Sequence, residues 1–275
     1  MSKKQYLTIG LCSAFLIVVY LFANTKKPPK DLSKEPSKAM AVEGSFNFKE
    51  YLSEVNKGLN ADTLKRIELL LPNISDEKVS DSVGFLYNLC NHPEVSAYYQ
   101  SLLAENKNSD TLWALAGERN YMAGILSGKN EELRTYLFDH AIIAFKKATE
   151  LKPNNDTYKV KLATCYMDGT PDVMSGVNIL REIVARDSNN VDAQFTLGRY
   201  GIVSGQFDKS IVRLEKVISL QPSNADAYLL IAEAYEKIGE IEKAIKALEK
   251  GKSLVEDPSF KQEIADYIAE LKKKI

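Results

Sequence analysis

The sequence predicts an all-α solenoid of helical hairpins, with an N-terminal transmembrane helix and a C-terminal capping helix. Three observations lead to this fold class. A pattern of apolar and small residues recurs 34 places apart within Val191–Pro258, apolar residues recur at helical spacing elsewhere, and an uncharged apolar run opens the chain. A repeat of this period is typical of stacked helical hairpins.

The first element is the apolar run Tyr6–Ala23, which contains no charged residue. As a helix it would span roughly 27 Å, about the thickness of the hydrocarbon core of a membrane. A cleaved signal peptide is the alternative. It is disfavoured because Leu21 stands where a small residue is wanted before a cleavage site. We therefore expect an uncleaved, single-pass signal anchor over residues 1–24.

Residues 25–45 are rich in Lys and Pro and poor in apolar residues, which predicts a flexible tether. Its lysines outnumber Lys3 and Lys4, and the positive-inside rule would then keep the following body in the cytoplasm. Long domains, however, are translocated largely regardless of charge. We expect the body on the non-cytoplasmic side, which is the periplasm if the cell is bacterial, and the opposite orientation stays open.

Residues 46–109 are expected to form two degenerate helical hairpins. Phe46–Leu71 carries two apolar stripes, and Asp76–Asn91 and Glu94–Asn106 form a second pair of helices. Val83-Gly84, followed by Tyr87, has the same spacing of an apolar residue, a small residue and a tyrosine as some of the later repeats.

The clearest copies of the repeat are 191–224 and 225–258. Gly198 aligns with Ala232, Leu214 with Leu248, and the turn residue Gly205 with its counterpart 34 places later. Each copy is expected to form two amphipathic helices around a short turn.

Small residues stand where the two helices of each copy must cross. Helices approach to about 8–10 Å only when the residues at the contact are small. Gly198 is expected to face Ser210, and Ala232 to face Ala244.

These positions resemble the tetratricopeptide repeat (TPR) pattern. Leu197-Gly198 and Ile231–Tyr235 match the first helix of the pattern. Ser210 and Ala244 match the small position of its second helix, and Pro222 closes the first copy. The resemblance implies a right-handed α-solenoid.

The same resemblance defines two earlier repeats and the last element. Residues 110–155 carry Gly117 and Ala141, with an insertion around Tyr121–Leu137 that should lengthen both helices. Residues 156–190 carry Ala163 and Gly176. Residues 259–275 have one apolar and one charged side, as a helix covering the end of a solenoid requires.

The composition and the absence of known motifs argue against nucleic-acid binding, metal binding and catalysis. The net charge of −1 offers no concentrated basic face for nucleic acid. The three cysteines have no CxxC spacing, and His92 and His140 lie far apart. No phosphate loop or catalytic motif occurs. We therefore expect no metal, cofactor or small-molecule substrate, and no enzymatic activity.

The resemblance implies that the first helices line a concave, protein-binding groove. Its expected residues are Leu115, Tyr121, Met122, Val160, Met167, Phe195, Arg199, Ile202, Leu229 and Glu233. The alternative is that several of them belong to the core.

The best-known grooves of the family hold a terminal carboxylate with Lys, Arg and Asn. At the matching positions of this chain only Lys161 and Arg199 are basic. The expected partner is therefore a protein with an apolar or amphipathic segment.

These features predict a membrane-anchored scaffold or adaptor that binds a protein partner. A weaker resemblance to TPR domains of cytochrome c maturation proteins implies, as the alternative, a chaperone-like subunit that holds apocytochrome. An enzyme is the third hypothesis, and nothing in the residues favours it.

Overall fold

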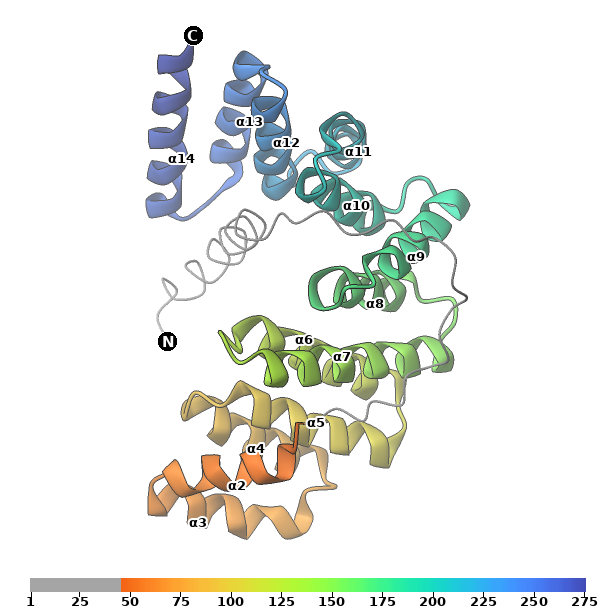
Figure 1. Cartoon of the computed structure of the whole chain (residues 1–275), viewed down its shortest axis with the longest axis vertical. Coiled ribbons are helices and arrows are strands. Elements are labelled where there is room, and N and C mark those ends of the chain that lie inside the picture. Colours follow the sequence, from red (N-terminus) through yellow and green to blue (C-terminus); the bar gives the residue numbers. More distant parts are fainter. Residues whose placement is uncertain (1–45) are drawn as a thin grey trace.

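The computed structural model describes residues 46–275, which form α-helices and two short 3₁₀ segments without any β-strand. The helices stack into a curved array that runs from α2 and α3 at one end to α14 at the other (Figure 1). The predicted anchor (1–24) and tether (25–45) lie outside the described residues. Between residues 46 and 275, none of the helices combines the length and the apolar character needed to cross a membrane.

From α4 onward the array is made of successive helical hairpins closed by a single helix. In chain order the helices are α2 (Phe48–Gly58), α3 (Ala61–Leu70), α4 (Glu77–Leu89), α5 (Pro93–Lys107), α6 (Asp110–Leu126), α7 (Glu131–Leu151), α8 (Asp156–Gly169), α9 (Val173–Arg186), α10 (Val191–Val203), α11 (Phe207–Leu220), α12 (Ala225–Lys237), α13 (Ile241–Leu254) and α14 (Pro258–Leu271). The 3₁₀ segments are η1 (Leu71–Asn73) and η2 (Lys272–Lys274).

Asn and Asp residues fix where most of the helices begin. Their side-chain oxygens accept hydrogen bonds from backbone N–H groups of the first turn, which have no partner inside the helix. The residues that do so are Asn47, Asn60, Asp76, Asn130, Asn155, Asp172, Asn190, Asn224 and Asp257. The turns after α10 and α12 each use a glycine at positive φ, Gly205 at 73° and Gly239 at 83°.

The small residues singled out in the sequence lie at the buried crossings of the hairpins. The Ser210 hydroxyl donates a hydrogen bond to the carbonyl oxygen of Gly198, so α10 and α11 touch at the expected point. A methyl group added at Gly176 would meet the backbone carbonyl of Ala163. Gly117, Ala141, Ala232 and Ala244 are buried in the same way.

The hairpin of α4 and α5 crosses in the same manner. A Cβ atom built on Gly84 would lie 2.8 Å from the Ser96 Oγ atom. These two residues are separated along the chain by the same twelve residues as Gly198 and Ser210. The α4–α5 pair is therefore built like the clearer repeats that follow it.

The insertion lengthens its hairpin, as predicted. Helix α6 has 17 residues and α7 has 21, whereas α10 and α11 have 13 and 14. The extra turns of α7 pack against helices on both sides of the hairpin. Leu133 and Leu137 pack into the N-terminal core with Phe48 of α2, and the Phe138 ring lies against Gly169 at the end of α8.

Helix α2 does not stack like the first helix of a regular repeat. The Phe48 ring stacks on Tyr98 of α5 at 4.6 Å and on Tyr136 of α7 at 5.1 Å between centroids. The Tyr51 hydroxyl donates to Glu94 Oε1 at 2.9 Å, and the Tyr87 hydroxyl of α4 donates to Asn56 at 2.8 Å. Helix α2 is thus held by side chains from three later helices.

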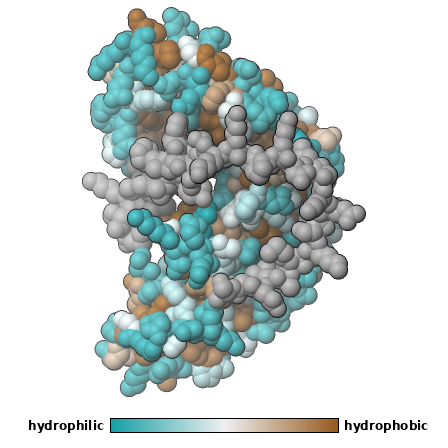
Figure 2. Space-filling view, viewed as in Figure 1, coloured by the Kyte–Doolittle hydropathy of each residue, from teal (hydrophilic) through white to brown (hydrophobic). Residues whose placement is uncertain are grey.

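The last helix covers the apolar side of the final hairpin. Ile264, Ile268 and Leu271 of α14 are buried in one core with Ile245 and Leu248 of α13. The outer surface mixes polar and apolar residues, with apolar side chains visible among polar ones at both ends of the array (Figure 2).

Candidate partner-binding surface

The first helices of successive hairpins, α6, α8, α10 and α12, lie side by side. We call the surface that they form the first-helix face. All ten groove residues expected from the sequence belong to these four helices.

Asp168, at the end of α8, is the centre of a polar cluster that joins three hairpins. Its carboxylate accepts hydrogen bonds from the Arg199 guanidinium of α10 at 3.1 Å and from the Tyr121 hydroxyl of α6 at 2.8 Å. Its backbone carbonyl accepts a bond from Arg134 of α7 at 2.8 Å. The Asp168 side chain is 7% exposed and that of Arg199 is 24% exposed, so this ion pair is largely shielded from water.

Burial keeps Tyr121 of the cluster and its neighbours Tyr200 and Cys165 protonated. Burial, reinforced by the Asp168 carboxylate, raises the pKa of Tyr121, and burial raises that of Tyr200 to about 12. Burial also raises the pKa of the Cys165 thiol. A thiol that stays protonated is a poor nucleophile. The cluster therefore holds helices together and offers no reactive group.

The second basic residue of the face is also paired. Lys161 of α8 lies 2.8 Å from Glu118 of α6, and both side chains are partly exposed. With Arg199 held by Asp168, both basic residues at the matching positions already have an acidic partner.

Apolar side chains remain accessible between these pairs. Leu115, Tyr121, Phe195 and Leu229 are partly buried, Phe195 and Leu229 because they also pack against the C-terminal core, and Met122 is 48% exposed. They come from α6, α10 and α12, so a ligand touching all of them would cross several hairpins.

Three of the expected groove residues belong to the core, which corrects the prediction that they line an open groove. Val160 and Met167 pack with Ala163 and Leu180 in the core of the α8–α9 hairpin, and Ile202 packs in the C-terminal core. Their helices turn these side chains toward the second helix of a hairpin, so a ligand on the face cannot reach them.

Glu233 of α12 is the remaining expected residue, and it is partly buried. Burial raises the pKa of Glu233 above its usual value, and Lys237 one turn along the helix opposes this shift. The face therefore carries an acidic group that is costly to keep charged.

Asp168 is the residue that the sequence reasoning missed, because the Gly and Pro that follow suggest a turn at this point. Its separation from Arg199 by about one repeat, with both on first helices, is the signal that could have paired them. Among residues 46–275 no cluster of His, Cys, Asp and Glu is suited to a metal ion.

The tetratricopeptide repeat family model matches residues 202–262 of the chain. No curated protein matches the sequence. Solved structures with a similar fold include PilW, a type IV pilus biogenesis factor, at 14% identity and a TM-score of 0.53. That match covers 70% of this chain and 84% of PilW. The APC/C heterotetramer Cut9–Hcn1 matches at 16% identity and a TM-score of 0.54, covering 82% of this chain and 42% of that one.

MamA matches at 22% identity and a TM-score of 0.47, covering 62% of this chain and 94% of MamA. At these identities the similarity concerns the fold alone. The matched repeat, the recurring small crossings and the stacked hairpins agree with one another. The chain carries a tetratricopeptide repeat over residues 202–262, and its earlier hairpins have crossings of the same kind.

Proposed function

We propose that this chain is a membrane-anchored adaptor whose first-helix face binds an apolar or amphipathic segment of a protein partner. Tetratricopeptide-repeat proteins are generally non-enzymatic scaffolds for protein interactions, which sets the class of function. The observation that carries the finer proposal is the pairing of Lys161 with Glu118 and of Arg199 with Asp168.

This pairing bears directly on the kind of partner. A salt-dependent carboxylate site needs cations that are not already neutralised. Here the cations hold neighbouring hairpins together, and the side chains left for a ligand are Leu115, Met122, Phe195 and Leu229. Methionine adapts its shape to varied apolar surfaces, and an amphipathic helix places apolar residues in one line.

The membrane part of the proposal rests on the sequence of Tyr6–Ala23, which lies outside the described residues. If the segment is an uncleaved anchor, the purified protein keeps Met1–Ala23 and needs detergent for extraction. A mature N-terminus at Asn24, read by mass spectrometry, would show instead a cleaved signal peptide. Protease protection in sealed vesicles would test our proposal that the body lies on the non-cytoplasmic side.

Site-specific photo-crosslinking in native membranes tests the binding surface. A photoreactive residue is placed at position 122 or 195 of the full-length chain, and a matched one at Val212, which is 66% exposed on the second helix α11. The proposal predicts crosslinks from positions 122 and 195 to an apolar or amphipathic segment, and none from position 212. Crosslinks to haem-free cytochrome c would support the chaperone alternative.

Alanine substitutions then measure how much the surface contributes. Phe195→Ala and Leu229→Ala should each weaken binding of the crosslinked segment by about 1–3 kcal/mol, as expected for apolar anchors at an interface. If these variants bind as wild type while Val212→Ala does not, the first-helix face is not the binding surface.

A further inference from the structure

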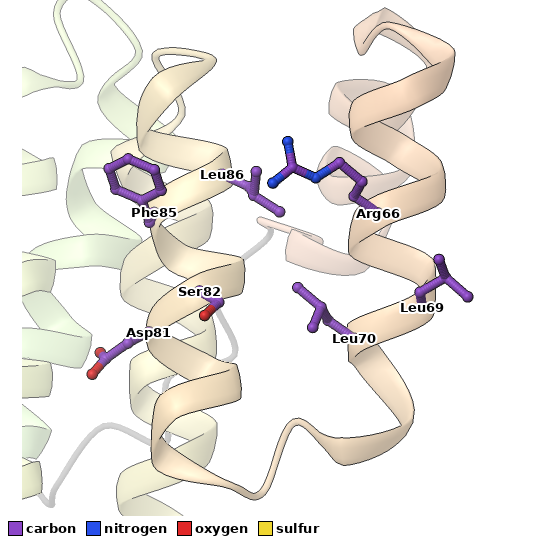
Figure 3. Close-up of a pocket in the computed structure, with 7 residues that line it drawn as sticks. All are labelled: Arg66, Leu69, Leu70, Asp81, Ser82, Phe85 and Leu86. Atoms are coloured by element: carbon purple, nitrogen blue, oxygen red, sulfur yellow. The ribbon is translucent and has the colours of Figure 1, made fainter.

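An open groove lies between α3 and α4, away from the four helices of the first-helix face. Its volume is about 600 Å³. Arg66 and Leu70 reach from α3 toward α4, where Ser82 and Leu86 lie opposite (Figure 3). The two leucines give the groove an apolar floor. We call this feature the α3–α4 groove.

Large apolar side chains that are mostly exposed flank the groove. Leu69 on α3 is 70% exposed and Phe85 on α4 is 60% exposed. Leu89, one turn further along α4, is 67% exposed. Single exposed apolar residues are ordinary, but a group of them around one groove marks an interaction surface.

Of the two charged side chains at the groove, Asp81 is already paired within residues 46–275 and Arg66 is not. The Asp81 carboxylate is held by Arg119 of α6 at 3.0 Å. Arg66 makes no ion pair or hydrogen bond with any other residue of the described chain. A ligand in the groove therefore meets one cation that is free to pair, next to an anion that is already neutralised.

We propose that the α3–α4 groove is a second docking site, which takes an amphipathic helix from a protein partner with an acidic residue opposite Arg66. Ser82, Phe85 and Leu89 are spaced by three and four residues, so they form one stripe along α4. A helix laid beside such a stripe presents its own apolar residues at the same spacing.

The small side chain of Ser82 lets this helix approach closely. Strand addition is not open to this site, because no β-strand edge exists in residues 46–275. The unpaired guanidinium of Arg66 favours a partner acid over a partner base. The proposal does not depend on what the first-helix face binds.

Selection from a displayed library of helix-forming peptides tests the proposal, with the full-length chain in detergent as the target. The enriched peptides should share apolar residues at helical spacing and an Asp or Glu beside them. Leu69→Asp and Phe85→Asp should each weaken their binding by about tenfold or more. Val212→Asp is the matched control, because Val212 is equally exposed and lies elsewhere; it should bind as wild type.

A charge exchange tests the role of Arg66 separately. Arg66→Glu should weaken binding of an enriched acidic peptide, and a peptide whose acid is changed to Lys should recover binding to this variant only. Circular dichroism of every variant checks that the helices are intact, and the milder Leu89→Ser replaces any variant that unfolds.

Several results would overturn the proposal. The first is a selection that enriches no helical family, and the second is a preference for basic peptides. The third is unchanged binding in both Phe85→Asp and Leu89→Ser. A dimer seen by sedimentation and lost in Phe85→Asp would assign the groove to a second copy of the chain instead.

Discussion

Replacing Arg199 with Ala should destabilise the centre of the array far more than loss of an ordinary surface charge would. The substitution leaves the Asp168 carboxylate, 7% exposed, without its cation. Removing one member of a buried pair costs about 3–5 kcal/mol. The Arg199 side chain is 24% exposed, and the Tyr121 hydroxyl still donates to Asp168 at 2.8 Å, so both facts reduce the cost. We expect a loss of about 2–4 kcal/mol.

Urea unfolding of the wild type, Arg199→Ala, Asp168→Asn and the double variant measures this loss and the coupling between the two residues. The double variant should cost less than the sum of the single variants, because neither charge is then left alone. Hydrogen exchange should rise mainly in α8 and α10, and less in α13, since repeats contact only their neighbours.

A loss below about 0.5 kcal/mol for Arg199→Ala, typical of exposed ion pairs, would refute this reasoning. So would single-variant costs that simply add. Either result would mean that water screens the pair and that the cluster does not join the hairpins.

Three other changes test different parts of the molecule. Gly176→Ala should lower the free energy of unfolding by about 1–3 kcal/mol or more, because the added methyl group meets the Ala163 carbonyl. The control Gly58→Ala, which has open space around it, should be neutral or slightly stabilising in the same thermal melt. Glu233→Gln should raise the melting temperature at neutral pH, because burial disfavours the charged carboxylate. The gain should shrink as the pH falls through the raised pKa of Glu233, because the wild-type side chain then also becomes neutral. A gain that grows in acid would contradict this prediction. Deleting residues 259–275 should expose the last hairpin and lower the melting temperature or cause aggregation, and a monomer with an unchanged melt would show that α14 is not a cap.

The hairpins were predictable from the sequence because their constraints are local. A crossing such as Gly198 with Ser210 requires small residues at a fixed spacing, and Ala232 with Ala244 repeats the same spacing of twelve residues. The extra turns of α6 and α7 follow in the same way from the length of the insertion.

The remaining features depend on contacts between repeats, which periodicity does not specify. The sequence places Asp168 before a Gly and a Pro, and only the stacking of α8 on α10 brings it to Arg199. The packing of α2 on Tyr136 depends on an extension of α7 nearly ninety residues away. Val160 was expected in the groove because register alone does not tell a groove side chain from a core one.

The central claim is that the first-helix face binds through apolar contacts while its cations hold the hairpins together. The most direct test is calorimetric titration of the full-length chain with the segment identified by crosslinking, at low and at high salt. We predict a Kd that changes little with salt, because few exposed ion pairs form on binding. We also predict a larger loss of affinity for Phe195→Ala than for Lys161→Ala. A Kd that weakens steeply with salt, with Lys161→Ala the most damaging change, would contradict the account.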